Sequence, residues 1–256
     1  MTMEDIRLEI AGKVLVVTLD RPPVNTLLLE TYQALADTFD AIGMRRDVNC
    51  VVFTAAGMKA FCAGLDLREF ASARLEDDPR RAAIVRHCFS AIRHCALPVI
   101  AAVNGPALGA GCVLTSVCDI RIAARNATFG LPEINVGRCG GTAHMGRHLP
   151  QGLLRRMFFT GRPIDAIDAQ RFGYVDQVVS SEELLPTAME LAGIIADKAP
   201  LGLRFGKAAL NEIEYLPVEE GYAAEQRYST RLMATDDARE ATRAVLEKRK
   251  PVWAGR

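Results

Sequence analysis

Two glycine-bearing segments are the parts of this chain whose residue types and spacing best suit chemistry. Residues 60–69 read AFCAGLDLRE, and residues 103–112 read VNGPALGAGC. Glycine lets a backbone approach a ligand closely or adopt a positive φ. Two N–H groups that converge there, one at a helix N-terminus, can bind an oxygen that gains negative charge. Taken alone, the spacing favours the simpler interpretation of two tight strand-to-helix turns.

A single glutamate, Glu133, is the candidate for proton transfer. It follows Leu131 and Pro132, and that context alone indicates a surface glutamate after a turn proline. In a desolvated pocket, however, the pKa of a glutamate rises toward neutrality, and the carboxyl group can then act as an acid and a base.

The first half of the sequence contains the elements that must position these segments. Two short apolar runs around the turn at Ala11-Gly12 predict a hairpin, a helical stripe follows it, and continuous apolar runs predict buried strands. These elements are a hairpin over 6–10 and 14–19, helices over 28–42, from 78 and from 110, and strands over 50–54, 99–103 and 120–123. Each glycine-bearing segment therefore follows a predicted strand.

After about residue 150 the sequence becomes helical in character. Helices are predicted over 153–159, 165–172, 182–198, 201–213, 218–233 and 237–248. Ser180 with Glu183, and Asp237 with Glu240, have the spacing of capping boxes, which supports two of these helix starts. Since no Gly/Ser/Pro-rich linker separates the halves, we expect one domain with a helical C-terminal extension.

Composition excludes several classes of function. The 256 residues are 50% hydrophobic, and 31 basic residues balance 31 acidic ones, so no global field favours nucleic acid or an anionic membrane. No signal segment or membrane span is recognisable, which predicts a cytoplasmic protein. The seven cysteines lack CxxC spacing and indicate buried, reduced thiols. The glycines fit neither GxGxxG nor the P-loop pattern, so a nucleotide cofactor is not supported.

Several motifs resemble the successive signatures of the enoyl-CoA hydratase/isomerase (crotonase) superfamily, in family order. The matching segments are residues 61–67, 98–105, 107–112 and 129–133, and the ending at 246–251 is also similar. The likeness extends from Asp20-Arg21-Pro22 across essentially the whole chain.

The resemblance implies an α/β fold, a crotonase-like spiral of ββα units with a helical C-terminal trimerisation region. Residues 1–195 would form the spiral core and residues 196–256 the helical region of the same domain. The expected ligand is an acyl-CoA thioester of fatty acid metabolism, with coenzyme A as part of the substrate and neither a further cofactor nor a metal. The expected assembly is a homotrimer or a hexamer made of two trimers.

The resemblance also assigns roles to particular residues. The backbone N–H groups of Leu65 and Ala110 would form an oxyanion hole, and Glu133 would be the catalytic acid/base. Residues expected to contact the substrate or its CoA are Ala60, Ala63, Gly64, Asp66, Leu67, Gly109, Val113 and Lys248.

Val113 departs from the family pattern. The family's hydratases carry a second glutamate at this position, and a valine neither transfers a proton nor anchors a water molecule. Chemistry with one base, such as double-bond isomerisation, is therefore favoured over two-glutamate hydration. A lyase, decarboxylase or acyl-CoA hydrolase of the same fold stays open, as does a catalytically weak acyl-CoA-binding subunit.

The loop from Gly137 to Gly141 is shorter than is usual in the family, which alters one wall of the acyl pocket. Within it, Cys139 is expected to be an inert packing cysteine. Arg138 is expected to be solvated, with recognition of an acyl carboxylate as the alternative.

Other polar residues are expected to have structural roles. His144 and His148 have i,i+4 spacing, but a third metal ligand is not apparent. Asp66 is expected to cap a helix rather than to act as an acid. Lys207, Lys248 and Lys250 could meet CoA phosphates, although solvated positions are favoured for each.

Overall fold

The main sheet begins with the predicted hairpin. In the computed structural model, which describes residues 5–256, β1 (Ile6–Ala11) pairs with β2 (Val14–Leu19) in antiparallel register. The next strands are all parallel to β2, and the sheet order is β1-β2-β3-β4-β6-β9. The added strands are β3 (Cys50–Ala55), β4 (Val99–Val103), β6 (Ile120–Ala124) and β9 (Gln177–Val179).

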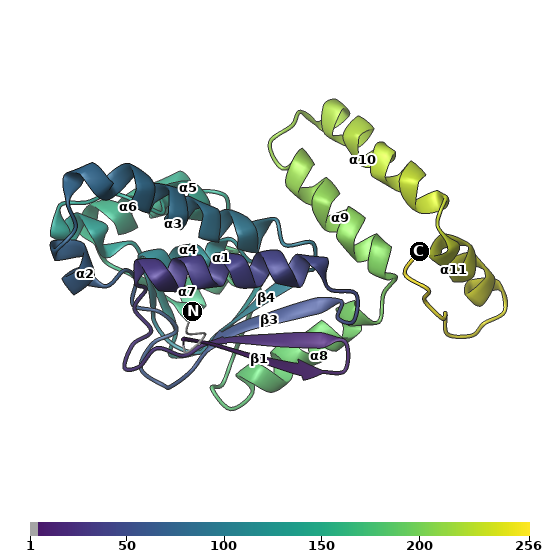
Figure 1. Ribbon diagram of the computed structural model, residues 1–256, viewed down its shortest axis with the longest axis horizontal. Helices are drawn as coiled ribbons and strands as arrows, with labels where there is room; N and C mark the ends of the chain where they lie inside the picture. The colour runs from purple at the N-terminus through teal and green to yellow at the C-terminus, as the bar shows by residue number, and fades with distance from the viewer. Residues whose placement is uncertain (1–4) are drawn as a thin grey trace.

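The central strands are buried on both faces, which explains their continuous apolar runs. Successive side chains of a strand point to opposite faces. Val51 and Phe53 therefore pack in the core under α1 (Leu29–Met44) and α3 (Asp78–Arg93), whereas Val52 packs toward α8 (Leu184–Ala196). Figure 1 shows α1 and α3 above the sheet and α8 below it.

A second, three-stranded sheet follows the order β5-β7-β8. Its strands are β5 (Ala107–Leu108), β7 (Thr128–Gly130) and β8 (Ile164–Asp165). Short helices surround it: α2 (Leu67–Ala71), α4 (Ala110–Ser116), α5 (Thr142–Met145), α6 (Gln151–Thr160), α7 (Ala166–Arg171) and the 3-10 helices η2 (Leu75–Asp77) and η3 (Pro132–Val136). None of these short strands was predicted from the sequence.

The last three helices form an arm that projects from the body (Figure 1). They are α9 (Pro200–Ile213), α10 (Val218–Met233) and α11 (Asp236–Leu246), so the boundary predicted between residues 195 and 196 falls at the end of α8. Lys207 anchors α9, because its Nζ donates to the Leu97 carbonyl (3.0 Å) and to Asp119 Oδ2 (2.7 Å). The expectation of a solvated Lys207 was wrong, since the side chain is buried in this ion pair.

One of the two predicted capping boxes is present. The Ser180 amide donates to Glu183 Oε2 (3.2 Å), and the Glu183 amide donates to Ser180 Oγ (3.3 Å). This reciprocal pair lies directly before α8.

The prediction of a second capping box, Asp237 with Glu240, was wrong. Thr235 caps α11 by accepting a hydrogen bond from the Ala238 amide. Asp237 is the second residue of α11, and its side chain is buried. Its carboxylate accepts hydrogen bonds from the Ala254 and Gly255 amides. Its carboxylate therefore ties the C-terminal segment to α11.

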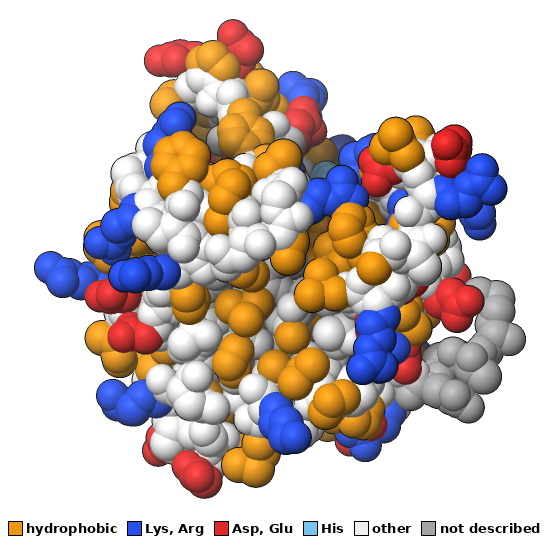
Figure 2. Space-filling view, turned by 90° about the vertical axis from the view of Figure 1, so that its left-hand side faces the viewer, with side chains coloured by type: hydrophobic (Ala, Val, Ile, Leu, Met, Phe, Trp, Pro, Cys, Tyr) orange, Lys and Arg blue, Asp and Glu red, His pale blue; other side chains and the backbone are white. Residues whose placement is uncertain are grey.

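Among residues 5–256, every helix is too short or too polar to cross a bilayer. The face at the end of the molecule that carries α2 and α6 shows apolar side chains over much of its centre, with charged side chains toward its rim (Figure 2). An apolar surface of this kind suits contact with an acyl group or with another subunit.

Gly111 allows α4 to pack directly against the backbone of the first glycine-bearing segment. A Cβ atom at this position would overlap the Cys62 carbonyl oxygen and lie 2.8 Å from the carbonyl carbon. We expect Gly111→Ala to lower the free energy of unfolding by about 3 kcal/mol, because backbone atoms cannot give way.

The matched control for this substitution is Gly152→Ala on α6, where a Cβ atom would meet nothing within 4 Å. This variant should gain roughly 0.5–1 kcal/mol from the better helix propensity of alanine. Denaturant unfolding measures both changes, and equal effects of the two substitutions would contradict the packing argument.

Candidate active site

Two glycines bring the predicted oxyanion segments together. Gly64 has a φ of 96° and Gly109 a φ of 55°, conformations that side chains disfavour. A Cβ atom on Gly64 would lie 2.9 Å from the Leu108 carbonyl oxygen and 3.7 Å from the Ala110 amide nitrogen. The backbones of residues 64–65 and 108–110 are therefore neighbours.

The amides of Leu65 and Ala110 are both available as donors. Leu65 forms a parallel bridge with Leu27, in which the Leu27 amide donates to Gly64 O (2.8 Å) and the Asp66 amide donates to Leu27 O (3.0 Å). The Leu65 N–H consequently points away from Leu27. Ala110 begins α4, and the first amides of a helix lack intrahelical partners. Within residues 5–256, neither amide has a hydrogen-bond acceptor.

Glu133 lies beside these amides. Strand β7 pairs with β5, and the Gly109 amide donates to Gly130 O (2.8 Å). Because η3 directly follows β7, this pairing positions Glu133 at the site. A Cβ atom on Gly109 would lie only 2.8 Å from Glu133 Oε1, so the carboxylate occupies the space that a side chain would need.

The environment of Glu133 changes its chemistry. Its Oε2 atom is buried and has no hydrogen-bond partner among residues 5–256. This loss of solvation raises the pKa of Glu133 above the ordinary value of 4.5. An unpaired, partly desolvated carboxylate of this kind is suited to accept and return a proton.

Val113 has apolar surroundings. The side chain is buried one turn after Ala110 on α4. Gly141, with a φ of 74°, covers it so closely that a Cβ atom there would lie 2.8 Å from Val113 Cγ2 and 2.7 Å from Leu131 Cδ2. The position at which the family's hydratases carry a second glutamate is thus closed by hydrocarbon.

A surface cavity of about 500 Å³ adjoins Leu65. Besides Leu65, its lining includes three of the residues predicted to contact the substrate: Ala63, Asp66 and Leu67. The other lining residues are Arg21, Pro22, Pro23, Thr26 and Arg68.

Ala60 and Lys248, also predicted to contact the substrate, are not among the residues that line this cavity. Ala60 is buried, and its carbonyl accepts from Asn25 Nδ2 (3.0 Å). Lys248 is exposed just after α11, and α11 lies at the opposite end of the molecule from α2 (Figure 1).

Asp66 caps α2, as expected. Its Oδ1 accepts from the amides of Arg68 (3.0 Å) and Glu69 (3.2 Å), and Thr26 Oγ1 donates to Oδ2 (3.2 Å). These hydrogen bonds, the Glu69 amide foremost, lower the pKa of Asp66. A carboxylate held in its charged form by these donors is a poor proton donor.

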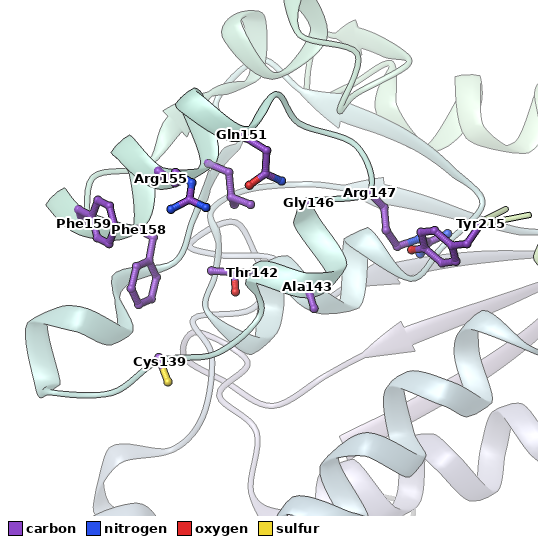
Figure 3. Close-up of a pocket in the computed structure, with 11 residues that line it drawn as sticks. Cys139, Thr142, Ala143, Gly146, Arg147, Gln151, Arg155, Phe158, Phe159 and Tyr215 are labelled. Carbon is purple, nitrogen blue, oxygen red and sulfur yellow. The ribbon is translucent and has the colours of Figure 1, made fainter. Parts of the chain in front are cut away.

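The cysteines agree with the prediction except at one position. Six are buried, but Cys139 is exposed, so the expectation of a packing role for it was wrong. Cys139 borders a second cavity of about 510 Å³ between α5 and α6. Figure 3 shows Phe158 and Arg155 on α6, Thr142 and Ala143 on α5, and Cys139 on the loop that precedes them.

The two histidines have structural positions. His144 packs its ring edge against Phe89, and His148 Nε2 lies 3.0 Å from the Ser116 carbonyl oxygen. Burial lowers the pKa of His148 to about 4. In the described part of the chain, no group of three or more His, Cys, Asp or Glu side chains is arranged to hold a metal ion.

Leu27 and Phe70 were missed by the sequence interpretation. Leu27 orients the Leu65 amide through the parallel bridge, and Phe70 supports Arg138 from α2. A one-residue bridge and a single aromatic residue have no periodicity that the sequence could reveal.

Comparison with known proteins shows the fold and the family of this chain. The sequence profile described as enoyl-CoA hydratase/isomerase matches residues 9–256. A crystal structure of an enoyl-CoA hydratase from Bacillus anthracis superposes with a TM-score of 0.95 at 32% identity, covering 99% of this chain and 100% of that one. The fold is therefore the crotonase fold.

Curated relatives are similar over nearly their whole length. A short-chain-enoyl-CoA hydratase of Clostridium acetobutylicum is 35% identical over 254 residues, covering 98% of this chain and 97% of the relative. A (7aS)-7a-methyl-1,5-dioxo-2,3,5,6,7,7a-hexahydro-1H-indene-carboxyl-CoA hydrolase of Mycobacterium tuberculosis is 39% identical over 238 residues, covering 92% and 95%. The chain belongs to the enoyl-CoA hydratase/isomerase family and is an acyl-CoA enzyme of that general type.

The raised pKa of Glu133 predicts a dependence of stability on pH. A carboxyl group whose pKa is higher in the folded state favours folding below its unfolded pKa, and this contribution is lost as the pH rises through the folded value. Glu133→Gln removes the charge, so the variant should be more stable than the native protein at pH 7. Below pH 4.5, where the native carboxyl is protonated, the difference should fade.

Denaturant unfolding at both pH values measures this effect. Glu225→Gln, at an exposed position on α10, is the control and should show little difference at either pH. A Glu133→Gln variant that is less stable than the native protein at pH 7 would show that the carboxylate is stabilised rather than desolvated.

Proposed function

We propose that this protein acts on an acyl-CoA through a thioester enolate, with Glu133 as its single acid/base. The observation that carries the proposal is the buried Oε2 of Glu133, which has no partner among residues 5–256. The Oε1 atom of the same carboxylate lies against Gly109, next to the Ala110 amide, and neither this amide nor that of Leu65 has an acceptor in the described part of the chain. Val113, where the family's hydratases carry a second glutamate, is a buried apolar residue.

The two amides provide the electrostatic part of this mechanism. Removal of the proton next to a thioester carbonyl moves negative charge onto the carbonyl oxygen. Donors that are already oriented toward that oxygen stabilise the transition state by about 3–4 kcal/mol each. Because Leu65 and Ala110 contribute backbone atoms, their apolar side chains need only leave the site open.

Glu133 provides the proton transfer. Its carboxylate removes the proton from C2 of a 3-enoyl thioester, and the electron pair moves to the thioester oxygen as the enolate forms. The protonated Glu133 then returns the proton to C4 while the carbonyl re-forms, which gives the 2-enoyl thioester. This sequence needs one carboxyl group, whereas addition of water across the double bond uses two in the family.

The cavity beside Leu65 is the proposed position of the CoA moiety. Ala63, Asp66 and Leu67 line it, while Gly64 and Gly109 keep the backbone close to the thioester. Ala60 is buried and is not among the lining residues. Neither a metal nor a further cofactor takes part in the proposed reaction.

We further propose a homotrimer, or a hexamer of two trimers. Lys248 follows α11, which lies at the opposite end of the molecule from α2 (Figure 1), and the first residue of α2, Leu67, lines the cavity. The expected contact of Lys248 with CoA would therefore have to come from a neighbouring subunit. The projecting arm of α9–α11 is the part of the chain that would reach that neighbour.

Hydrolysis is the second candidate function. It is favoured by the 39% identical relative, which is named a carboxyl-CoA hydrolase, and by the absence of a second carboxyl at Val113. A hydrolase that cleaves the thioester releases free CoA, which a thiol reagent detects, whereas isomerisation does not. A catalytically weak binding subunit would show no turnover with any acyl-CoA.

We expect Glu133→Gln to reduce turnover without weakening the binding of acyl-CoA. The variant should bind acyl-CoA with nearly native affinity, because shape and volume are kept. Its turnover should fall by about 10²–10⁴-fold, because a positioned acid/base contributes that much. Steady-state kinetics and calorimetry measure the two quantities, and an unchanged kcat would place the base elsewhere.

We expect isomerisation to be faster than hydration. Given matched 3-enoyl-CoA and 2-enoyl-CoA substrates, the native enzyme should isomerise the first faster than it hydrates the second. The difference should be about 10²-fold or more, since hydration lacks one acid/base group. Product analysis by chromatography checks this, and hydration that equals or exceeds isomerisation would overturn the single-base mechanism.

A further inference from the structure

Arg138 lies close to the proposed catalytic group and has an unusual environment. Its amide donates to the Glu133 carbonyl (2.9 Å), so it follows Glu133 by little more than one turn. Its side chain reaches across to α2, where the guanidinium carbon lies 4.1 Å from the centre of the Phe70 ring. Arg138 thus joins the turn that carries Glu133 to the helix that follows Leu65.

The helix that carries Phe70 is firmly attached. Glu69 receives a hydrogen bond from the Leu29 amide (2.9 Å) and another from Arg81 Nη1 (2.9 Å). Asp66 caps the same helix. Phe70 is therefore a fixed platform, and stacking on it holds the Arg138 guanidinium in one orientation.

The stacked guanidinium keeps its donors free. Stacking uses the face of the group, whereas its N–H bonds point outward in the plane. Among residues 5–256, these N–H groups have no hydrogen-bond acceptor, and Asp78 Oδ1, their ion-pair partner, is 4.0 Å from Nη2. Arg81, by contrast, is hydrogen-bonded to Glu69.

A guanidinium without a hydrogen-bond acceptor among residues 5–256, on the turn that carries Glu133, is suited to a carboxylate. The cavity proposed for CoA is lined by Arg21 and Thr26, so the acyl group would extend from the enolate in another direction. Arg138 and Phe70 join the Glu133 turn to α2, and an acyl group that extends toward this contact would meet the guanidinium.

We infer that Arg138 binds a carboxylate at the far end of the acyl group, so that the preferred substrates are acyl-CoA thioesters with a second, free carboxyl group. This inference rests on the proposed function for the position of the acyl group. The Arg138 side chain is 45% exposed, so the contact is partly screened by water and its effect is moderate.

The test compares the binding of two saturated acyl-CoA thioesters of equal chain length, one ending in a methyl group and one in a carboxylate. Both are unreactive toward isomerisation, so calorimetry reports binding alone. We expect the native protein to bind the carboxylated thioester at least tenfold more tightly. Arg138→Ala should abolish this preference while the affinity for the methyl-ended thioester stays within twofold.

Two further variants sharpen the test. Arg80→Ala removes an exposed arginine of α3 and should leave the preference intact, which excludes a general effect of surface charge. Asp78→Asn removes the carboxylate nearest to Arg138 and should strengthen the preference, because the competing charge is gone.

The outcomes separate this inference from the proposed function. Equal binding of the two thioesters, or a preference that survives Arg138→Ala, overturns the inference even if 3-enoyl-CoA is isomerised. A preference that depends on Arg138, without turnover of any enoyl-CoA, supports the inference and counts against the proposed reaction. Failure of both thioesters to bind counts against both proposals.

Discussion

The close approach of two backbone segments is the constraint on which the site depends. Residues 62–65 and 107–111 lie so near each other that glycine is required at 64 and at 111, where a Cβ atom would meet backbone atoms of the opposite segment. Bridges from Cys62 to Ala107 and from Leu27 to Leu65 keep the segments in register. The separation of the two free amides is therefore fixed by main-chain packing rather than by side-chain choice, which is the pre-organisation that oxyanion binding needs.

The same architecture places an unfavourable group at the centre of the site. Glu133 has one buried oxygen without a partner among residues 5–256, and such a group lowers stability. The surrounding structure tolerates it because β7, which directly precedes η3, is held by pairing with β5. Strand pairing in the sheets thus holds a poorly solvated carboxylate in place, and the proposed reactivity of Glu133 depends on that poor solvation.

Much of the framework could be predicted from the sequence because its signals are long and periodic. The stripe of α1 and the continuous apolar runs of β3 and β4 extend over five or more residues, and the apolar runs of β1 and β2 flank the turn at Ala11-Gly12. The strands β5 and β8 contain two residues each, which is too short for any period to show. The site motifs were predicted by resemblance, whereas the pairing of Leu27 with Leu65 was not.

The errors have a common physical origin in partners that are distant in sequence. Lys207 looked like a surface lysine, but Asp119 lies opposite it in the fold. Asp237 had capping spacing, yet the chain end returns to occupy its carboxylate. Cys139 was assigned to packing, although the shortened loop leaves it exposed. Local pattern cannot reveal such tertiary contacts.

The contact between Gly109 and Glu133 has a consequence for how the sequence can drift over evolutionary time. One position is a glycine partly because the other side chain fills its space, so the two are coupled although 24 residues apart. A descendant that first lost the long carboxylate would gain room for a side chain at 109. Once that side chain was fixed, regaining a glutamate at 133 would no longer restore the original site, so the loss would tend to be irreversible.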